Sequence, residues 1–216
     1  MLSAAKHLDR ARSFGLRPQD DRRALSHVAF DRWEALAASR ASLAVMFLWA
    51  VAEATVWPII PDFLLVPLAV GAQRRFLRPL LASILGSTLG GAALYVFAHR
   101  RPSRARALLA ALPFVAERHV RTAEAGIAEH GAWAFLLQPW SGVAFKVWAL
   151  VAASRGVDPA LAIPASVAGR ALRMAISAAL PGLLSARFRR TVRDHALALT
   201  ALYGAAFGAV LRALMR

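Results

Sequence analysis

The sequence predicts an all-α integral membrane protein. We expect two inverted repeats, each a re-entrant, proline-broken helical hairpin plus a transmembrane helix, followed by a terminal transmembrane helix and accompanied by amphipathic surface helices. Three observations lead to this fold class. Hydrophobic residues make up 58% of the 216, whereas soluble domains average roughly 45–50% apolar residues. Charged residues fall mainly between the apolar runs, as in polytopic membrane proteins. Prolines interrupt several of those runs.

Residues 1–40 are predicted to form a polar N-terminal segment with one amphipathic helix. Its apolar residues recur at helical spacing: Leu25, Val28, Ala29, Trp33, Leu36 and Ala37. Such a helix lies either on the membrane surface or against the protein's own core. No apolar stretch precedes Ala41, so we do not expect a cleaved secretory signal.

Residues 41–216 are predicted to form a single membrane domain that starts with a hairpin over 41–72. This apolar run exceeds the ~20 residues that one helix needs to cross the hydrocarbon. Pro58, Pro61 and Pro67 interrupt it by removing backbone donors. Two half-length helices around Pro58 and Pro61 fit better than one strongly tilted helix, and they would enter and leave on one side.

The remaining runs are assigned in the same way. A second hairpin over 132–154 is favoured by Gln138, Pro139 and Gly142 at its centre, although its length also allows one ordinary span. Helix 80–98 carries a stripe of small residues that permits close helix packing. The other predicted elements are an amphipathic helix over 107–128, interrupted near Pro113, a span over 159–180 and a last span over 196–211.

Five charged residues inside the apolar runs are the candidate transport site: Glu53, Asp62, Lys146, Arg170 and Arg173. Charges at membrane depth are costly, and they usually mark ion or substrate pathways. The two carboxylates could bind and release protons in a water-filled cavity. Alternatively, Asp62 only caps a half-helix and Glu53 only pairs with a buried cation. The three cations could neutralise the carboxylates or hold a lipid phosphate.

Other function classes find no support in the sequence. There is no cysteine, the histidines lie outside the apolar runs and no metal-ligand spacing or nucleophile motif occurs. We therefore expect neither an enzyme nor a cofactor. The net charge of +15 is interpreted as contact with anionic lipid headgroups rather than with nucleic acid. The sequence leaves open whether the protein forms a homo-oligomer. The distribution of basic loops predicts a multi-pass protein of the cytoplasmic (inner) membrane with its N-terminus in the cytoplasm.

The order of these motifs resembles the DedA/VTT (SNARE-associated) superfamily, closest to its YqaA-like branch. The resemblance covers roughly residues 45–180. It rests on Glu53, Pro58-x-x-Pro61-Asp62, Gly86-Ser-x-x-Gly90-Gly91, the run Gly131-Ala-Trp-Ala-Phe-Leu-Leu, Pro139 and Gly169-Arg170-x-x-Arg173. The chain departs from the family at Gln138, where many members have Arg, and at Lys146, where Arg or an acidic residue is common. The resemblance implies two re-entrant hairpins that face each other and move lipids between leaflets. Bacterial relatives are implicated in undecaprenyl phosphate recycling or phospholipid transport with proton-motive force, and eukaryotic relatives are scramblases.

The leading functional hypothesis is a lipid transporter or scramblase that moves a phosphate-bearing lipid between leaflets, gated by protons at Glu53 and Asp62. Two alternatives use the same residues differently. One is a proton-coupled carrier of a small polar solute, and the other is a non-transporting membrane assembly protein whose buried charges simply pair.

Overall fold

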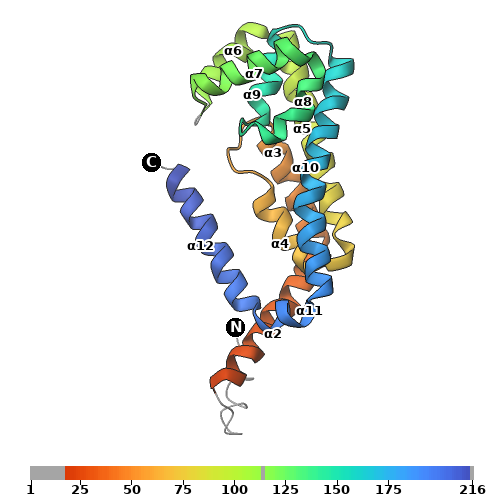
Figure 1. The fold of residues 1–216 in the computed structure, drawn as a ribbon, viewed down its shortest axis with the longest axis vertical. Coiled ribbons are helices and arrows are strands. Elements are labelled where there is room, and N and C mark those ends of the chain that lie inside the picture. The colour runs from red at the N-terminus through yellow and green to blue at the C-terminus, as the bar shows by residue number, and fades with distance from the viewer. Residues whose placement is uncertain (1–17, 113–114, 215–216) are drawn as a thin grey trace.

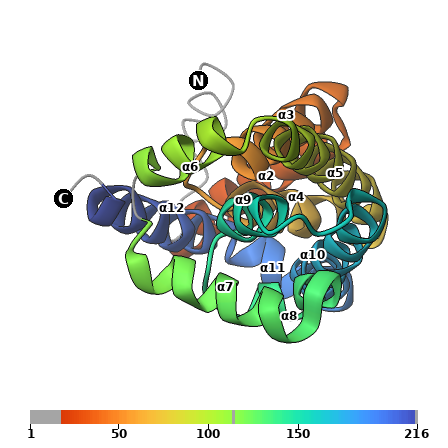
Figure 2. The same ribbon diagram turned by 90° about the horizontal axis from the view of Figure 1, so that it is seen from above.

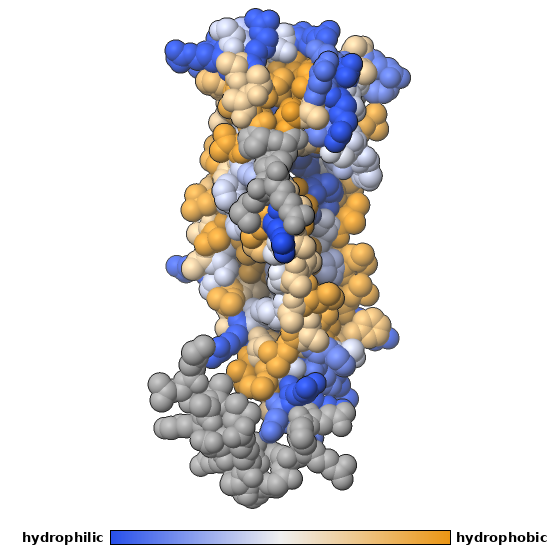
Figure 3. Space-filling view, turned by 90° about the vertical axis from the view of Figure 1, so that its left-hand side faces the viewer, coloured by the Kyte–Doolittle hydropathy of each residue, from blue (hydrophilic) through white to orange (hydrophobic). Residues whose placement is uncertain are grey.

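The protein is an elongated bundle of helices in the computed structural model, which describes residues 18–112 and 115–214. Within these ranges every regular element is helical. Three helices are long and apolar enough to cross a membrane: α5 (Leu77–Arg100), α10 (Pro159–Arg187) and α12 (Ala196–Leu214). Hydrophobic residues cover much of the middle of the molecule, and hydrophilic residues gather at its upper end (Figure 3). This distribution fits a bundle surrounded by lipid between two polar ends.

The N-terminal helices α2 (Pro18–Ala38) and α3 (Arg40–Thr55) meet at a bend of 68°. Ser39 lies at the bend in extended backbone conformation, and its Oγ accepts a hydrogen bond of 3.0 Å from the Ser42 N–H. A serine in this conformation satisfies one free N–H at the start of a helix. The chain therefore stops α2 and starts α3 in a new direction at one residue.

Helices α3 and α4 (Asp62–Ala72) run in opposite directions on either side of an irregular segment, residues 56–61 (Figure 1). We call this segment the first break. Pro58 and Pro61 cannot donate backbone hydrogen bonds, which ends the helical ladder here. Helix α3 packs on α5, whereas α4 packs on α2 and α10.

The glycines of α5 permit the contact with α3. A Cβ atom on Gly86 would lie 2.3 Å from the Phe47 carbonyl oxygen, and one on Gly90 would lie 2.6 Å from the Val51 carbonyl oxygen. Only glycine allows the two backbones to come this close. The small residues of α5 therefore serve helix packing at these two positions.

The predicted amphipathic helix over 107–128 is wrong in its extent. Two helices stand there instead, α6 (Pro102–Ala111) and α7 (Glu117–His130). Pro102 begins α6, as suits a residue whose missing N–H would have no partner in the first turn. The predicted interruption at Pro113 lies outside the described residues.

The chain from Gly131 to Ser154 consists of short pieces. The segment begins with η2 (Gly131–Trp133), α8 (Ala134–Leu137) and η3 (Gln138–Trp140) and ends in α9 (Phe145–Ser154). Residues 138–144, which we call the second break, separate α8 from α9. Every residue of α9 from Phe145 to Ala153 is buried, and Figure 2 shows α9 near the centre of the bundle, surrounded by other helices. The first limb of the predicted second hairpin is thus made of single turns rather than a half-length helix.

Helix α12 differs from the other apolar helices because it is almost entirely exposed. After α10, the short helix α11 (Arg189–Asp194) reverses the chain, and α12 then stands away from α4 and α3 (Figure 1). Ala196 is its only buried side chain among those described. Its contact with the middle of the bundle passes through Phe63, whose ring centroid lies 6.0 Å from that of Tyr203 and 5.3 Å from that of Phe207.

Candidate functional site

The structure pairs Glu53 with Arg170 in the interior of the bundle. Arg170 Nη2 lies 2.5 Å from Glu53 Oε2, and both side chains are about as inaccessible as core residues, at 7% and 6% exposure. The two residues are 117 positions apart in sequence, on α10 and α3. An isolated charge in this place would be strongly unfavourable, so each member of the pair stabilises the other.

Two further side chains hold the Arg170 guanidinium, and the sequence analysis assigned neither to the site. Ser87 on α5 accepts a hydrogen bond of 2.9 Å from Arg170 Nη2, and the Phe145 ring lies 4.4 Å from the guanidinium carbon, in cation–π contact. Ser87 belongs to the stripe of small residues on α5. Its hydroxyl, which stands among glycines, was the one feature of the sequence that could have indicated a polar partner for Arg170. Phe145 carried no such sign, because its role depends on where α9 packs.

Asp62 and Arg173 form the second ion pair. Arg173 Nη1 lies 2.8 Å from Asp62 Oδ2, and the pair is more accessible than the first, at 29% and 14% exposure. The contact between Arg173 and Asp62 is an ion pair without hydrogen-bond geometry. Asp62 Oδ2 is therefore buried without a hydrogen-bond partner among the described residues. Asp62 is the first residue of α4, whose N-cap residue is Pro61 and has no side-chain capping hydrogen bond. The charge of Asp62 nevertheless lies favourably at the positive end of the helix dipole.

Lys146 connects α9 with the first break. It is 4% exposed and lies in the first turn of α9, directly after the second break. Its Nζ donates a hydrogen bond of 2.6 Å to the backbone carbonyl of Trp57 in the first break. No carboxylate oxygen lies within 4.0 Å of Nζ among the residues that the structure describes. Lys146 therefore binds backbone, and Arg170 rather than Lys146 pairs with Glu53.

The residues predicted to interrupt the second hairpin lie in an irregular segment. Side chains of this segment make hydrogen bonds to its own backbone. Gln138 is buried, and its Nε2 donates 2.9 Å to the Val143 carbonyl. Ser141 Oγ donates 2.7 Å to the Gln138 carbonyl and accepts from the Val143 N–H. Gly142 adopts φ +71°, a conformation in which a Cβ is strained. Pro139 belongs to η3 and lies between Gln138 and Ser141, whose side chains make these hydrogen bonds.

The space next to Arg170 is small. A cavity of about 10 Å³ is lined by Ile84, Ser87, Thr88, Ser166, Val167 and Arg170. This is about the least volume that holds one water molecule. Arg170 Nε is buried there without a hydrogen-bond partner among the described residues, and a single water would satisfy it. A lipid headgroup does not fit into this cavity without movement of the surrounding helices.

The arrangement thus gathers all five predicted charges around the first break. Two carboxylates and three cations leave one formal positive charge, and the cations come from α9 and α10, far along the chain from the carboxylates. Such a group can bind an anion or change its ion pairing when a carboxylate is protonated. In the described part of the chain, no cluster of three or more His, Cys, Asp or Glu could hold a metal ion.

Searches with this chain match no family model, no curated protein and no solved structure. The resemblance stated from the sequence motifs accordingly stays a prediction.

Proposed function

We propose that this protein is a multi-pass protein of the cytoplasmic membrane that moves a phosphate-bearing lipid between leaflets. Undecaprenyl phosphate and phospholipids are the candidate substrates. The charged residues around the first break carry the proposal. Arg170, Arg173 and Lys146 offer cationic donors to a phosphate, and protonation of Glu53 or Asp62 releases the arginine that the carboxylate neutralises.

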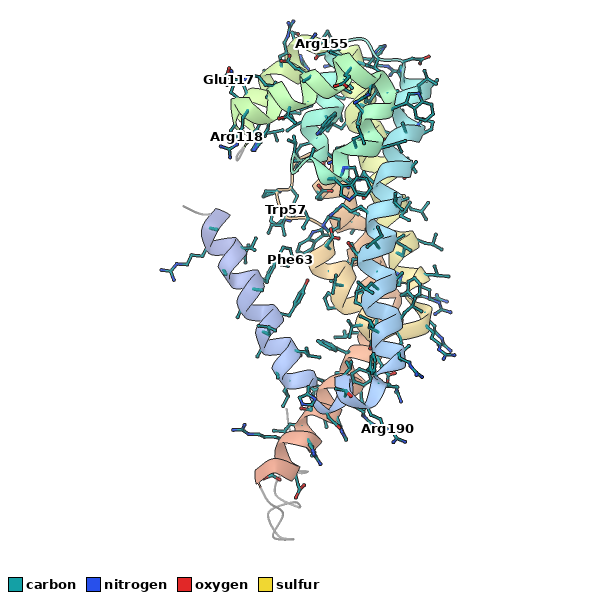
Figure 4. All side chains as sticks on the ribbon, in the orientation of Figure 1. Trp57, Phe63, Glu117, Arg118, Arg155 and Arg190 are labelled. Atoms are coloured by element: carbon teal, nitrogen blue, oxygen red, sulfur yellow. The ribbon has the colours of Figure 1, made fainter. Side chains whose placement is uncertain are left out.

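The proposal assigns the transport pathway to the side of the bundle that faces α12. The first break presents apolar side chains there, with Trp57 44% and Ile60 43% exposed, and Figure 4 shows Trp57 and Phe63 on the side toward α12. An acyl chain is compatible with such a surface, since it stays in hydrocarbon while the headgroup crosses. Movement of α12 about its base at α2 and α11 would break the ring contacts with Phe63 and the hydrogen bond of 3.4 Å that the Tyr203 hydroxyl donates to the Asp62 carbonyl.

The plan of two opposed hairpins belongs to the same proposal. The chain before the first break ascends and α4 descends, while the second break lies nearer the upper end (Figure 1). The hydrogen bond from Lys146 to Trp57 joins the two breaks. Two inverted repeats with a binding site between them are a common plan of secondary transporters. We also propose that the N-terminal end of the bundle faces the cytoplasm.

A leaflet assay tests the function. The purified protein is reconstituted into liposomes with a trace of headgroup-labelled phospholipid, and a membrane-impermeant quencher reports how fast inner-leaflet label reaches the outside. We expect Glu53→Gln to lower this rate at least about tenfold, which is the effect of about 1.4 kcal/mol on a barrier, and to flatten its dependence on pH. Wild-type liposomes no faster than protein-free liposomes would refute lipid movement.

The matched control is Glu124→Gln. Glu124 also pairs with an arginine, at 3.0 Å to Arg155, but both side chains lie exposed at the upper end of the molecule. The same chemical change there should leave the rate unaltered. If both variants lose the same activity, the loss reflects general charge and the role of Glu53 is wrong.

A non-transporting assembly protein is the second candidate, and the pairing of both carboxylates with arginines favours it. Glu53 and Arg170 neutralise each other, and the neighbouring cavity holds at most about one water. If pairing is their whole purpose, Glu53→Leu with Arg170→Leu should restore both stability and the cellular phenotype of the wild type. Restored stability with lost lipid movement favours the transporter instead.

A further inference from the structure

A second charged site lies at the other end of α4, away from the two breaks. Here the turn from α4 into α5 meets the end of α2, and a pocket of about 420 Å³ opens between them. This volume falls in the range of small-ligand sites. Its apolar wall consists of Ala37, Ala38, Gly71 and Ala72, and its polar wall consists of Glu34, Gln73, Arg74, Arg75 and Arg78.

The pocket carries a strong excess of positive charge. Glu34 is its only acidic residue, and Arg189 of α11 neutralises it with two bonds of 2.7 Å to Oε1 and Oε2. Arg74, Arg75 and Arg78 have no carboxylate oxygen within 4.0 Å in residues 18–112 and 115–214. Three guanidinium groups therefore surround one pocket without an internal counter-charge.

The backbone that presents these arginines is held in an uncommon conformation. Gln73 has φ 51° and ψ −120°, and it is the only non-glycine residue with positive φ in the described part of the chain. An L-residue in this region is strained. The Gln73 side chain donates 2.8 Å to Glu34 Oε1, which ties the turn to α2. Gly71 allows this approach, because a Cβ there would lie 2.7 Å from the Trp33 carbonyl oxygen.

We propose that this pocket binds the phosphate group of an anionic membrane lipid. Arginine suits this ligand because its planar fork donates two parallel hydrogen bonds to phosphate oxygens. Hydrogen bonds from Gln73 and Arg189 to Glu34 hold the turn that carries Arg74 and Arg75. Arg78 reaches the pocket from the first turn of α5. The pocket thus presents donors from two elements to one anion.

A lipid is favoured over free phosphate by the apolar surface at the pocket. The pocket lining itself includes Ala37, Ala38 and Ala72, and two sequence neighbours of lining residues, Leu36 and Leu77, are 57% and 55% exposed outside it. The pocket lies where the apolar helix α5 begins, so its ligand meets the hydrocarbon boundary. An acyl chain can cover these leucines while the phosphate lies among the arginines, which inorganic phosphate cannot do.

The experiment measures equilibrium binding to the full-length protein in neutral detergent. The probes are dihexanoyl phosphatidate, dihexanoylglycerol, which lacks the phosphate, and inorganic phosphate, all at one fixed ionic strength. We expect phosphatidate to bind and each of the other two to bind at least about tenfold more weakly. Equal binding of dihexanoylglycerol would refute phosphate recognition, and equal binding of inorganic phosphate would refute the assignment to a lipid.

Two variants with matched controls locate the site. Replacing Arg74, Arg75 and Arg78 with Gln should weaken phosphatidate binding at least about tenfold, since hydrogen bonds to charged groups are lost. The same replacement at the exposed residues Arg100, Arg101 and Arg104, at the other end of α5, should not. An equal loss in both triple variants would show attraction by net charge alone and overturn the site.

Ala38→Phe tests the pocket without changing any charge. Ala38 is exposed and lines the pocket, so a phenyl ring there fills the space and should also weaken binding. Ala35→Phe on the same helix lies outside the lining residues and should bind as the wild type does. Unchanged binding by Ala38→Phe would overturn the pocket. None of these measurements depends on lipid movement between leaflets, so this site and the proposed function can fail separately.

Discussion

The two breaks in the helices interrupt apolar sequence with proline, but they are stabilised in different ways. In the first break, side chains from outside the segment satisfy backbone carbonyls: Lys146 of α9 donates to the Trp57 carbonyl, and Trp49 Nε1 of the neighbouring α3 donates 3.2 Å to the Ile59 carbonyl. In the second break, Gln138 and Ser141 close the segment from within. Only the first break has carboxylates at its sides.

This difference indicates which break depends on hydrogen bonds from other parts of the molecule. A break that relies on donors from outside changes when those donors move, whereas a break with its own hydrogen bonds holds its shape. The first break is therefore the one whose geometry can respond to protonation or ligand binding.

Arg170→Leu should have the largest effect, because it leaves Glu53 buried and unpaired. We expect a loss of about 3–5 kcal/mol in the free energy of unfolding. Chemical denaturation in detergent, followed by tryptophan fluorescence, measures it. The double variant Glu53→Leu with Arg170→Leu should recover most of the loss. Equal instability of the single and double variants would contradict pairing as the cause.

Gln138→Leu should have a smaller effect that stays local. It leaves the Val143 carbonyl without its side-chain donor in a buried turn, which costs about 1–3 kcal/mol. Amide exchange should rise in residues 138–144 and stay unchanged in residues 56–61. A rise in both segments would show that the second break is not self-contained.

Lys146→Met should change total stability by less than about 1 kcal/mol, because losing the hydrogen bond is offset by no longer burying a charge. Its effect should appear instead at the first break, where amide exchange of Ile59 and Ile60 should become faster once the Trp57 carbonyl loses its donor. Unchanged exchange there would mean that Lys146 does not hold the first break.

The smallest effect concerns neither break but the contact of α2 with α11. His27 Nε2 lies 2.6 Å from Asp194 Oδ1, and this hydrogen bond, with the nearby charges of His27, Arg23 and His195, lowers the pKa of Asp194 below its ordinary value. The contribution is complete above the unfolded carboxyl pKa of about 3.9 and is lost as the pH falls through the lower folded value.

The protection factors of the α11 amides, measured against the intrinsic exchange rate at each pH, should therefore fall below about pH 4. Asp194→Asn should remove this pH dependence without changing exchange at either break. If acidification instead accelerates exchange in residues 56–61 through Asp194, the end of the bundle and the first break are coupled.

Local sequence determined most of the helices, but it did not determine every position at which they stop: Pro67, expected to break the helical ladder, lies inside α4, and α10 continues through Pro164 and Pro181. Proline removes a backbone donor wherever it stands, and a long apolar run has to be buried in protein or lipid, so Pro58, Pro61, Pro139 and the runs of α5, α10 and α12 could be assigned without a fold. The same reasoning placed the five charges in apolar surroundings. Over 107–128 it missed only the bounds of the helices, because these depend on how α6 and α7 pack around α9.

Only the tertiary structure decided which charges meet. Arg170 and Arg173 lie on one helix face and could each have paired with either carboxylate, and Lys146 was an equal candidate for Glu53. The packing of α10 against α3 and α4 chose Arg170 for Glu53 and Arg173 for Asp62, and it left Lys146 to a backbone carbonyl. Such choices depend on distances between segments that lie 89 to 117 positions apart in sequence, and no local pattern in the chain contains them.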